Sequence, residues 1–193
     1  MKFTIYQASR QGGRKNNQDR VAYSYSREAL LMVVADGMGG HMHGEIAAQI
    51  AVQTLTDQFQ KMAKPRLDDP MAFLADATTR AHYAINDYAV EQDLLEIPHT
   101  TSVAAVIQDN TAYWAHVGDS RLYLFSDGSL LARTEDLETA TRTHDEQGSR
   151  RGNLVGQRAG AVAEKLEAGS IVGRGRDRVH AIAIREEAQL RRR

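Results

Sequence analysis

The 193-residue chain contains no cysteine, only three prolines and no aromatic residue after Phe125. The absence of cysteine excludes disulfides, thiolate metal ligands and a cysteine nucleophile, so any metal site must use oxygen or imidazole ligands. No apolar run approaches the roughly 20 residues of a membrane span, and the N-terminus carries no apolar signal segment. A net charge of -1 provides no positive field for nucleic acid or acidic membranes. We therefore expect a cytoplasmic protein without a nucleic-acid or membrane partner.

The composition of the chain changes after about residue 132. The first part holds every aromatic residue and seven arginines, whereas the last 61 residues hold twelve arginines and no aromatic residue. Such a segment has little apolar surface to offset the conformational entropy lost on folding. We expect one domain core over residues 1–136 and a poorly packed, arginine-rich tail over residues 137–193. Within the tail, the patterns at 159–168 and 179–185 are compatible with a short helix and a strand.

The order of the secondary-structure signals predicts an α+β fold with antiparallel sheets covered by helices. Apolar residues recur at helical spacing over residues 44–62 and about 70–95. The second helix is expected to begin at Asp69-Pro70, a capping carboxylate followed by a proline in the first turn. Helices and strands do not alternate, so a doubly wound nucleotide-binding fold is excluded. Branched and aromatic residues predict strands at 3–6, 21–25, 29–35, 102–107, 112–117 and 121–125.

The segment 36–41, Asp-Gly-Met-Gly-Gly-His, follows the apolar strand predicted at 29–35. A carboxylate at the end of a core strand is costly to bury unless a cation or hydrogen bonds compensate its charge. Asp36 is therefore interpreted as a metal ligand or, alternatively, as part of an ordinary Asp-Gly turn. His41 and His43 follow, and they are candidates for proton transfer or phosphate contact because imidazole titrates near neutral pH.

Two further polar segments carry side chains that can bind phosphate or a metal ion. Arg14 and Asp19 lie in the loop 13–20, where a guanidinium can bind phosphate oxygens and an acid can hold a cation or its water. The alternative for this loop is a solvated hairpin connection. Gly118-Asp119 ends the strand at 112–117, where two sheets can bring Asp119 near Asp36 unless the two turns are independent. Carboxylate and carbonyl ligands favour Mg²⁺ or Mn²⁺ over zinc.

Four separated segments stand in a recognisable order and spacing, namely Arg14–Asp19, Val34–His41 followed by Gly44-Glu45, Thr100-Thr101 and Gly118–Tyr123. Together they resemble the bacterial metal-dependent type 2C (PPM) Ser/Thr protein phosphatases. The resemblance runs from about residue 5 to residue 136. It implies an antiparallel β-sandwich flanked by helices, with a site for two metal ions at one end. It also implies hydrolysis of phosphoserine and phosphothreonine in proteins, and a partner Ser/Thr kinase that the enzyme opposes.

The resemblance implies a set of metal ligands. Asp36 would bridge two Mg²⁺ or Mn²⁺ ions, and the carbonyl of Gly37 would complete one ligand set. Asp19 would act mainly through metal-bound water, and Asp119 would help to hold a third, weaker ion. Two divalent ions lower the pKa of a bridging water and offset charge during an in-line attack on phosphorus, so no covalent phosphoenzyme is needed. Arg14 would grip the substrate phosphate, and His41 would lie near the substrate.

The chain departs from the family pattern after Asp136. The family continues with a Thr-x-Asp-His step and then with Ser-Asp-Gly and Asp-Asn segments whose acids complete the first metal site. Here Leu137 replaces the histidine, and the later aspartates, Asp145 and Asp177, match neither segment. A reading frame shifted near codon 137 would produce this change. Three functions remain open: an active phosphatase, a catalytically impaired phosphoprotein-binding or regulatory module, and a metal-binding sensor.

Overall fold

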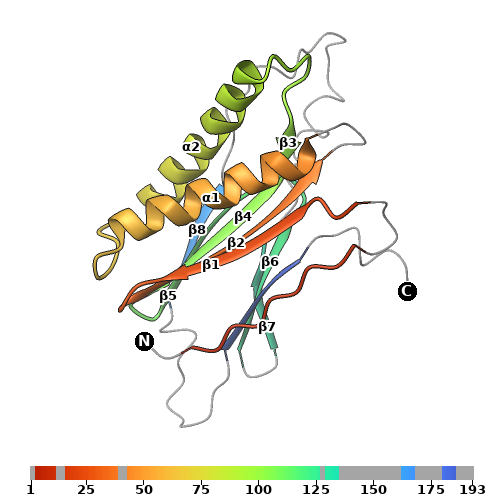
Figure 1. Ribbon diagram of the computed structural model, residues 1–193. Helices are drawn as coiled ribbons and strands as arrows, with labels where there is room; N and C mark the ends of the chain where they lie inside the picture. Colours follow the sequence, from red (N-terminus) through yellow and green to blue (C-terminus); the bar gives the residue numbers. More distant parts are fainter. Residues whose placement is uncertain are drawn as a thin grey trace, which may run out of the picture.

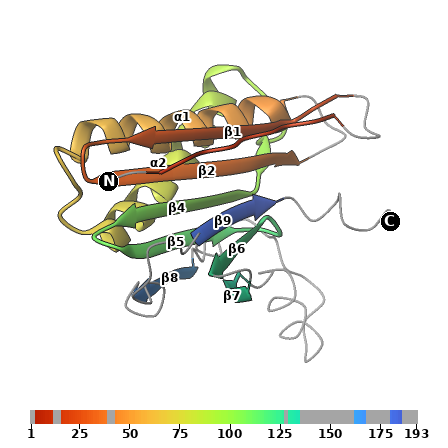
Figure 2. The same cartoon turned by 90° about the horizontal axis from the view of Figure 1, so that it is seen from below.

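The computed structural model describes residues 3–11, 16–38, 43–126, 129–134, 162–167 and 180–185. Arg14 and His41 lie outside the described residues. The described segments form three layers, which are two helices, a larger antiparallel sheet and a smaller antiparallel sheet (Figures 1 and 2). This arrangement confirms the predicted α+β fold class. Neither of the helices in the described part of the chain is long and apolar enough to cross a membrane.

The two sheets differ in size within the described residues. In the larger sheet β3 pairs with the end of β2, and the other strands are neighbours in the order β1-β2-β4-β5-β8. The smaller sheet has the order β7-β6-β9. The strands of the larger sheet are β1 (Asp19–Tyr25), β2 (Ala29–Met38), β3 (His99–Thr100), β4 (Ser102–Gln108), β5 (Thr111–Val117) and β8 (Val162–Glu167). Those of the smaller sheet are β6 (Arg121–Ser126), β7 (Ser129–Arg133) and β9 (His180–Arg185).

The central strands β2, β4 and β5 of the larger sheet are largely buried on both faces, because apolar residues run almost continuously along them. Helices α1 (Gly44–Met62) and α2 (Pro70–Glu91) cover one face, and the smaller sheet lies below the other (Figure 1). Side chains such as Leu31 and Phe59 fill the layer between helices and sheet. Trp114 and Leu122 belong to a second cluster between the two sheets.

The helix boundaries follow from local capping. Helix α1 spans the predicted residues, and the side chain of Asp69 accepts hydrogen bonds from the backbone N–H groups at the start of α2, as the sequence predicts. Helix α2 ends at Glu91 rather than near residue 95. There the N–H of Asp93 donates to the carbonyl of Val90, the N–H of Leu94 donates to that of Ala89, and Asp93 has a φ of 51°. This left-handed cap usually carries glycine, so an aspartate gave no stop signal in the sequence.

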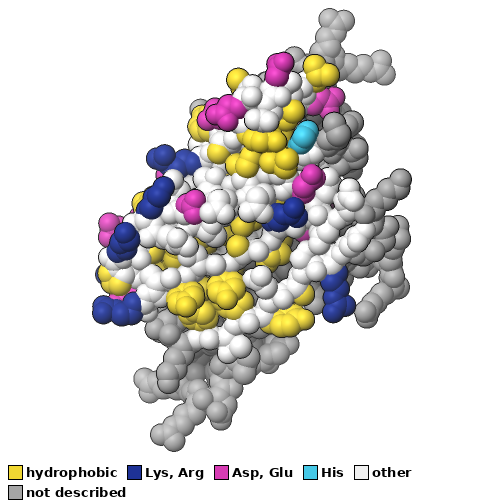
Figure 3. Space-filling model, in the orientation of Figure 1, with side chains coloured by type: hydrophobic (Ala, Val, Ile, Leu, Met, Phe, Trp, Pro, Cys, Tyr) yellow, Lys and Arg dark blue, Asp and Glu magenta, His cyan; other side chains and the backbone are white. Residues whose placement is uncertain are grey.

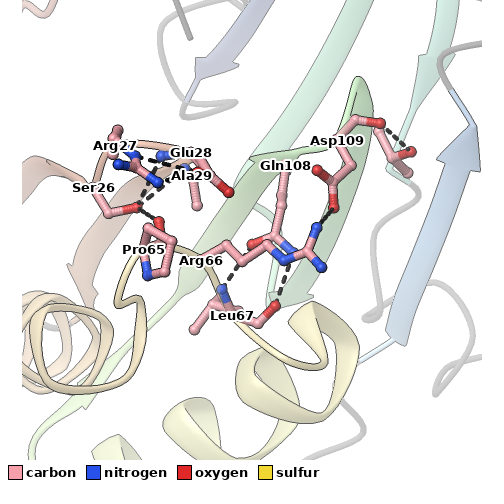
Figure 4. A network of polar contacts seen from close by, with 10 residues as sticks. Ser26, Arg27, Glu28, Ala29, Pro65, Arg66, Leu67, Gln108 and Asp109 are labelled. Carbon is pink, nitrogen blue, oxygen red and sulfur yellow. Dashed lines mark hydrogen bonds and ion pairs between the residues drawn. The ribbon is translucent and has the colours of Figure 1, made fainter.

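The connection between the helices is fixed by a polar network at one end of the larger sheet (Figure 4). The side-chain amide of Gln108 accepts from the N–H of Leu67 and donates to its carbonyl, with both distances 2.8 Å. The hydroxyl of Ser26 and the N–H of Glu28 both donate to the carbonyl of Pro65. The loop between α1 and α2 is thereby attached to the β1–β2 and β4–β5 hairpins.

Besides the end of α2, three sequence-based expectations need correction. Residues 3–6 are not in a strand, although the ring of Phe3 packs edge-on against Tyr25 with centroids 5.6 Å apart. Residues 162–167 form strand β8 rather than part of a helix, and the strand expected at 179–185 is confirmed as β9. As a strand, β8 pairs with β5 and gives hydrogen-bond partners to the main-chain groups along the outer edge of β5. If residues 162–167 were helical, that edge would stay unpaired. The third correction concerns Asp36, described below. The domain boundary after residue 136 stays a prediction.

Candidate functional site

Asp36 and Asp19 lie opposite each other on neighbouring strands. The chain does not turn at Asp36, since β2 continues through Gly37 to Met38, so the Asp-Gly turn interpretation is wrong. Asp36 is the register partner of Asp19 on β1. Directly opposed residues of an antiparallel pair project from the same face, with Cβ atoms about 4.5–5.5 Å apart. The two carboxylates therefore share the face that packs towards the smaller sheet, at the end of β2.

Gly37 is required because helix α1 packs directly onto its backbone. A Cβ atom at Gly37 would lie 2.2 Å from the carbonyl oxygen of Gly44, the first residue of α1. The N–H of Gly37 donates to the carbonyl of Gln18 at 3.3 Å. The sequence suggested a glycine for a sharp turn, whereas the structure shows that a close helix approach requires it.

A side-chain contact secures the start of α1 to the segment before β1. The amide nitrogen of Gln18 donates to a carboxylate oxygen of Glu45 at 3.2 Å. A hydrogen bond with its own backbone N–H lowers the pKa of Glu45, and the bond from Gln18 and the nearby charges of His43 and Arg20 act in the same direction. Sequence reasoning gave Gln18 and Glu45 no role, because no local pattern connects two residues so far apart in the chain.

The threonine pair beside β3 fixes the backbone of Asp36. The N–H of Thr101 donates to the carbonyl of Asp36 at 2.8 Å, and the hydroxyl of Thr100 donates to the same oxygen at 2.9 Å. In return, the N–H of Asp36 donates to the hydroxyl oxygen of Thr101 at 3.2 Å. Because both main-chain groups of Asp36 are bonded to this pair, the start of its side chain is held in one place.

Thr101 also contacts the turn that carries Asp119. Its hydroxyl oxygen lies 2.6 Å from that of Ser120. A Cβ atom at Gly118, where φ is 91°, would lie 2.8 Å from a methyl carbon of Thr101. The turn between β5 and β6 is therefore attached to the same threonine that holds Asp36.

The described donors suit a hard divalent cation held by few protein ligands. Among the described residues, no group of three or more histidine, aspartate or glutamate side chains is placed to hold a metal ion. Asp119 is thus linked to Asp36 through Thr101 rather than joined with Asp19 and Asp36 in one cluster. Mg²⁺ accepts one or two carboxylates and completes its octahedral shell with water and substrate phosphate. A carboxylate pair with the Gly37 carbonyl fits that preference.

Of the remaining candidate site residues, the structure describes only His43. Arg14 and His41 fall outside the described residues, so their roles stay predictions. His43 lies at the N-terminal boundary of α1 with a φ of 90° and makes no side-chain capping hydrogen bond. Its ring lies 6.4 Å from that of Tyr88 on α2, centroid to centroid.

Comparison with known proteins assigns the chain to a family. A family model described as protein phosphatase 2C matches residues 7–147. The chain belongs to the protein phosphatase 2C family. The match extends beyond residue 136, where the resemblance seen in the sequence stops.

Individual phosphatases support the assignment. The serine/threonine protein phosphatase PstP of Mycobacterium tuberculosis is 36% identical over 141 residues, which is 70% of this chain and 25% of that protein. The serine/threonine phosphatase stp of Listeria welshimeri is 35% identical over 107 residues, or 55% of this chain and 42% of that protein. The crystal structure of the PstP catalytic domain with two manganese ions matches with a TM-score of 0.61 and 29% identity, covering 80% of this chain and 67% of that one. The chain spans half or less of the length of these curated relatives.

Proposed function

We propose that this member of the protein phosphatase 2C family is a metal-dependent enzyme that removes phosphate from phosphoserine and phosphothreonine residues of proteins. The observation that carries the proposal is the opposed pair Asp19 and Asp36, whose main chain is fixed by register and by Thr101. Two carboxylates held this close repel each other unless a cation lies between them. The two manganese ions in the PstP structure support Mg²⁺ or Mn²⁺ as that cation.

Each predicted site residue has a defined task in this proposal. Asp36 and the carbonyl of Gly37 would hold the divalent ions, Asp19 would act mainly through metal-bound water, and Asp119 would help to hold a third, weaker ion. The ions supply Lewis-acid activation of the attacking water and neutralise charge on the phosphoryl group. Arg14 binds the phosphate oxygens and His41 lies beside the substrate.

The cellular setting is part of the same proposal. The substrates are phosphorylated proteins, and a partner Ser/Thr kinase supplies the phosphate groups that this enzyme removes. We propose that the reaction takes place in the cytoplasm.

The test is manganese-dependent hydrolysis of para-nitrophenyl phosphate and of a phosphothreonine peptide by the purified full chain. Asp36→Asn should lower turnover by roughly two to three orders of magnitude, since a bound cation contributes several kcal/mol to the transition state. Asp57→Asn, on α1, is the matched control and should retain activity. Manganese binding, followed by the electron paramagnetic resonance of the free ion, should weaken only in Asp36→Asn. Equal turnover in both variants would refute the role of Asp36.

A second candidate function is a catalytically impaired module that binds phosphoproteins. It is favoured by the lack, among the described residues, of a third acid grouped with Asp19 and Asp36. A site with two carboxylates binds a divalent ion weakly. This function predicts that the chain binds a phosphothreonine peptide better than its unphosphorylated form but gives no metal-dependent turnover.

A further inference from the structure

One region of the surface combines exposed aliphatic side chains with negative charge. It covers the last turns of α2 and the segment leading to β3, and we call it the acidic–apolar surface. Val90, Leu95 and Ile97 are 81%, 103% and 45% exposed. Asp87, Glu91 and Asp93 lie exposed among them. Figure 3 shows apolar and acidic side chains, without a lysine or arginine, around the upper end of α2.

The charge on this surface is of one sign over a long stretch of sequence. Residues 81–120 contain no lysine and no arginine. Asp87, Glu91 and Asp93 form no ion pair within the described part of the chain. Their negative field is therefore available to a cationic partner, whereas acidic partners are repelled.

The exposed aliphatic residues are held in place by the chain on both sides. The N–H groups of Asp93 and Leu94 are bonded to the last turn of α2, and Pro98 is buried. Leu95 and Ile97 lie between these two anchors. A surface ordered before binding loses less conformational entropy when a partner docks. Single exposed aliphatic residues are common, whereas here three lie within eight residues of the chain.

The acidic–apolar surface leads along the chain to the candidate phosphatase site. Thr100 follows Ile97 by three residues, and its hydroxyl donates to the carbonyl of Asp36. Three residues span at most about 11 Å, so Ile97 lies within that distance of Thr100 along the chain. The exposed side chain of Met38, which pairs with His99, lies between the two regions. A peptide that places its phosphate at Asp36 can therefore reach Ile97 and Leu95 with the next few residues.

We propose that the acidic–apolar surface binds the segment flanking the phosphorylated residue of a protein substrate. It selects segments that carry both lysine or arginine and aliphatic side chains. The aliphatic side chains pack against Leu95 and Ile97, and the cations pair with Glu91, Asp93 and Asp87. This proposal rests on the proposed function, because it assigns substrate selection to the same site.

The test compares three phosphothreonine peptides of equal length whose flanks are basic and aliphatic, neutral and polar, or acidic. Binding to the full chain is followed by fluorescence anisotropy in manganese buffer, and turnover is measured alongside. The wild type should prefer the basic and aliphatic peptide. Leu95→Ser/Ile97→Ser should weaken that peptide's binding roughly five- to tenfold, as loss of a central apolar contact does in other interfaces. Glu91→Lys/Asp93→Lys should reverse the preference between basic and acidic flanks. High salt should reduce both the wild-type preference for basic flanks and its reversal in the variant.

Matched variants separate docking from nonspecific effects. Leu130→Ser/Leu131→Ser replaces two exposed leucines on β7. Asp57→Lys/Asp68→Lys reverses the charge of two acidic residues that lie outside the acidic–apolar surface. Both controls should leave peptide preference unchanged, and no variant should alter hydrolysis of para-nitrophenyl phosphate. Phosphate-dependent binding or turnover with equal affinity for all flanks would overturn the docking proposal and leave the proposed function intact. A preference for the basic and aliphatic flank without metal-dependent turnover of any peptide would overturn the proposed function, and absence of any peptide binding would overturn docking.

Discussion

The hydroxyl oxygens of Thr101 and Ser120 lie 2.6 Å apart in the interior, where the two residues are 0% and 1% exposed. The same Thr101 oxygen accepts the N–H of Asp36. Asp36 lies near the end of β2 in the larger sheet, and Ser120 follows Asp119 in the turn that leads to the smaller sheet. A single buried hydroxyl therefore joins the two places that carry the predicted metal ligands.

Thr101→Val should destabilise the protein by about 1–3 kcal/mol, because it leaves the buried hydroxyl of Ser120 and the N–H of Asp36 without this partner. Urea denaturation gives the free energy of unfolding. Ser120→Ala alone should lower the free energy of unfolding by less than Thr101→Val does. The double variant Thr101→Val/Ser120→Ala should cost less than the sum of the two single changes, since the two residues share one hydrogen bond. Strict additivity would contradict the coupling.

Gly118→Ala should cost about 1–3 kcal/mol, because φ is 91° and the new methyl group would meet the side chain of Thr101. Thermal and urea denaturation both measure this cost. Thr101→Ser removes the methyl carbon that would lie 2.8 Å from the new Cβ atom of residue 118. The double variant Gly118→Ala/Thr101→Ser should therefore recover part of the stability that Gly118→Ala loses. An unchanged stability of Gly118→Ala would show that the turn adopts another conformation.

Gln108→Leu should destabilise the protein by about 2–4 kcal/mol, because the N–H and carbonyl of Leu67 would both lose their partner in a buried setting. The matched control is Asp109→Asn, which removes only the exposed ion pair with Arg66 and should cost less than about 1 kcal/mol. Manganese binding at Asp36 should remain, since Gln108 lies at the other end of the larger sheet. Comparable losses in both variants would contradict the importance of the buried amide.

Glu45→Gln should lower stability at about pH 7 and have less effect near pH 4. The pKa of Glu45 is lowered in the folded protein, so the ionised group stabilises the fold above its ordinary pKa of 4.5. This contribution disappears as the pH falls through the lowered folded-state pKa. The effect should be small because the carboxylate is partly solvated. Paired urea denaturations of wild type and variant at the two pH values measure it, and a difference that grows towards low pH would refute the assignment.

Local sequence patterns determined the helices and most strands. The amphipathic spacing of α1 and the Asp69-Pro70 start of α2 are properties of consecutive residues, so they can be read without a structure. The end of α2 was missed because Asp93 occupies a position that usually carries glycine. The strand expected at Phe3 failed because a strand needs a partner, and residues 3–11 have no ladder in the described structure.

The sequence alone determined the family and the identity of the candidate ligands, since Asp19, Asp36, Gly37 and Asp119 stand in recognisable local settings. Only the tertiary structure decided what surrounds them. In the tertiary structure Asp19 lies opposite Asp36, and α1 packs against the backbone of Gly37. Thr101 connects Asp36 to the turn that carries Asp119. These contacts connect residues many positions apart, and their energy depends on register, close packing and buried hydrogen bonds. Such terms arise only when separate strands meet, so no local pattern in the chain can specify them.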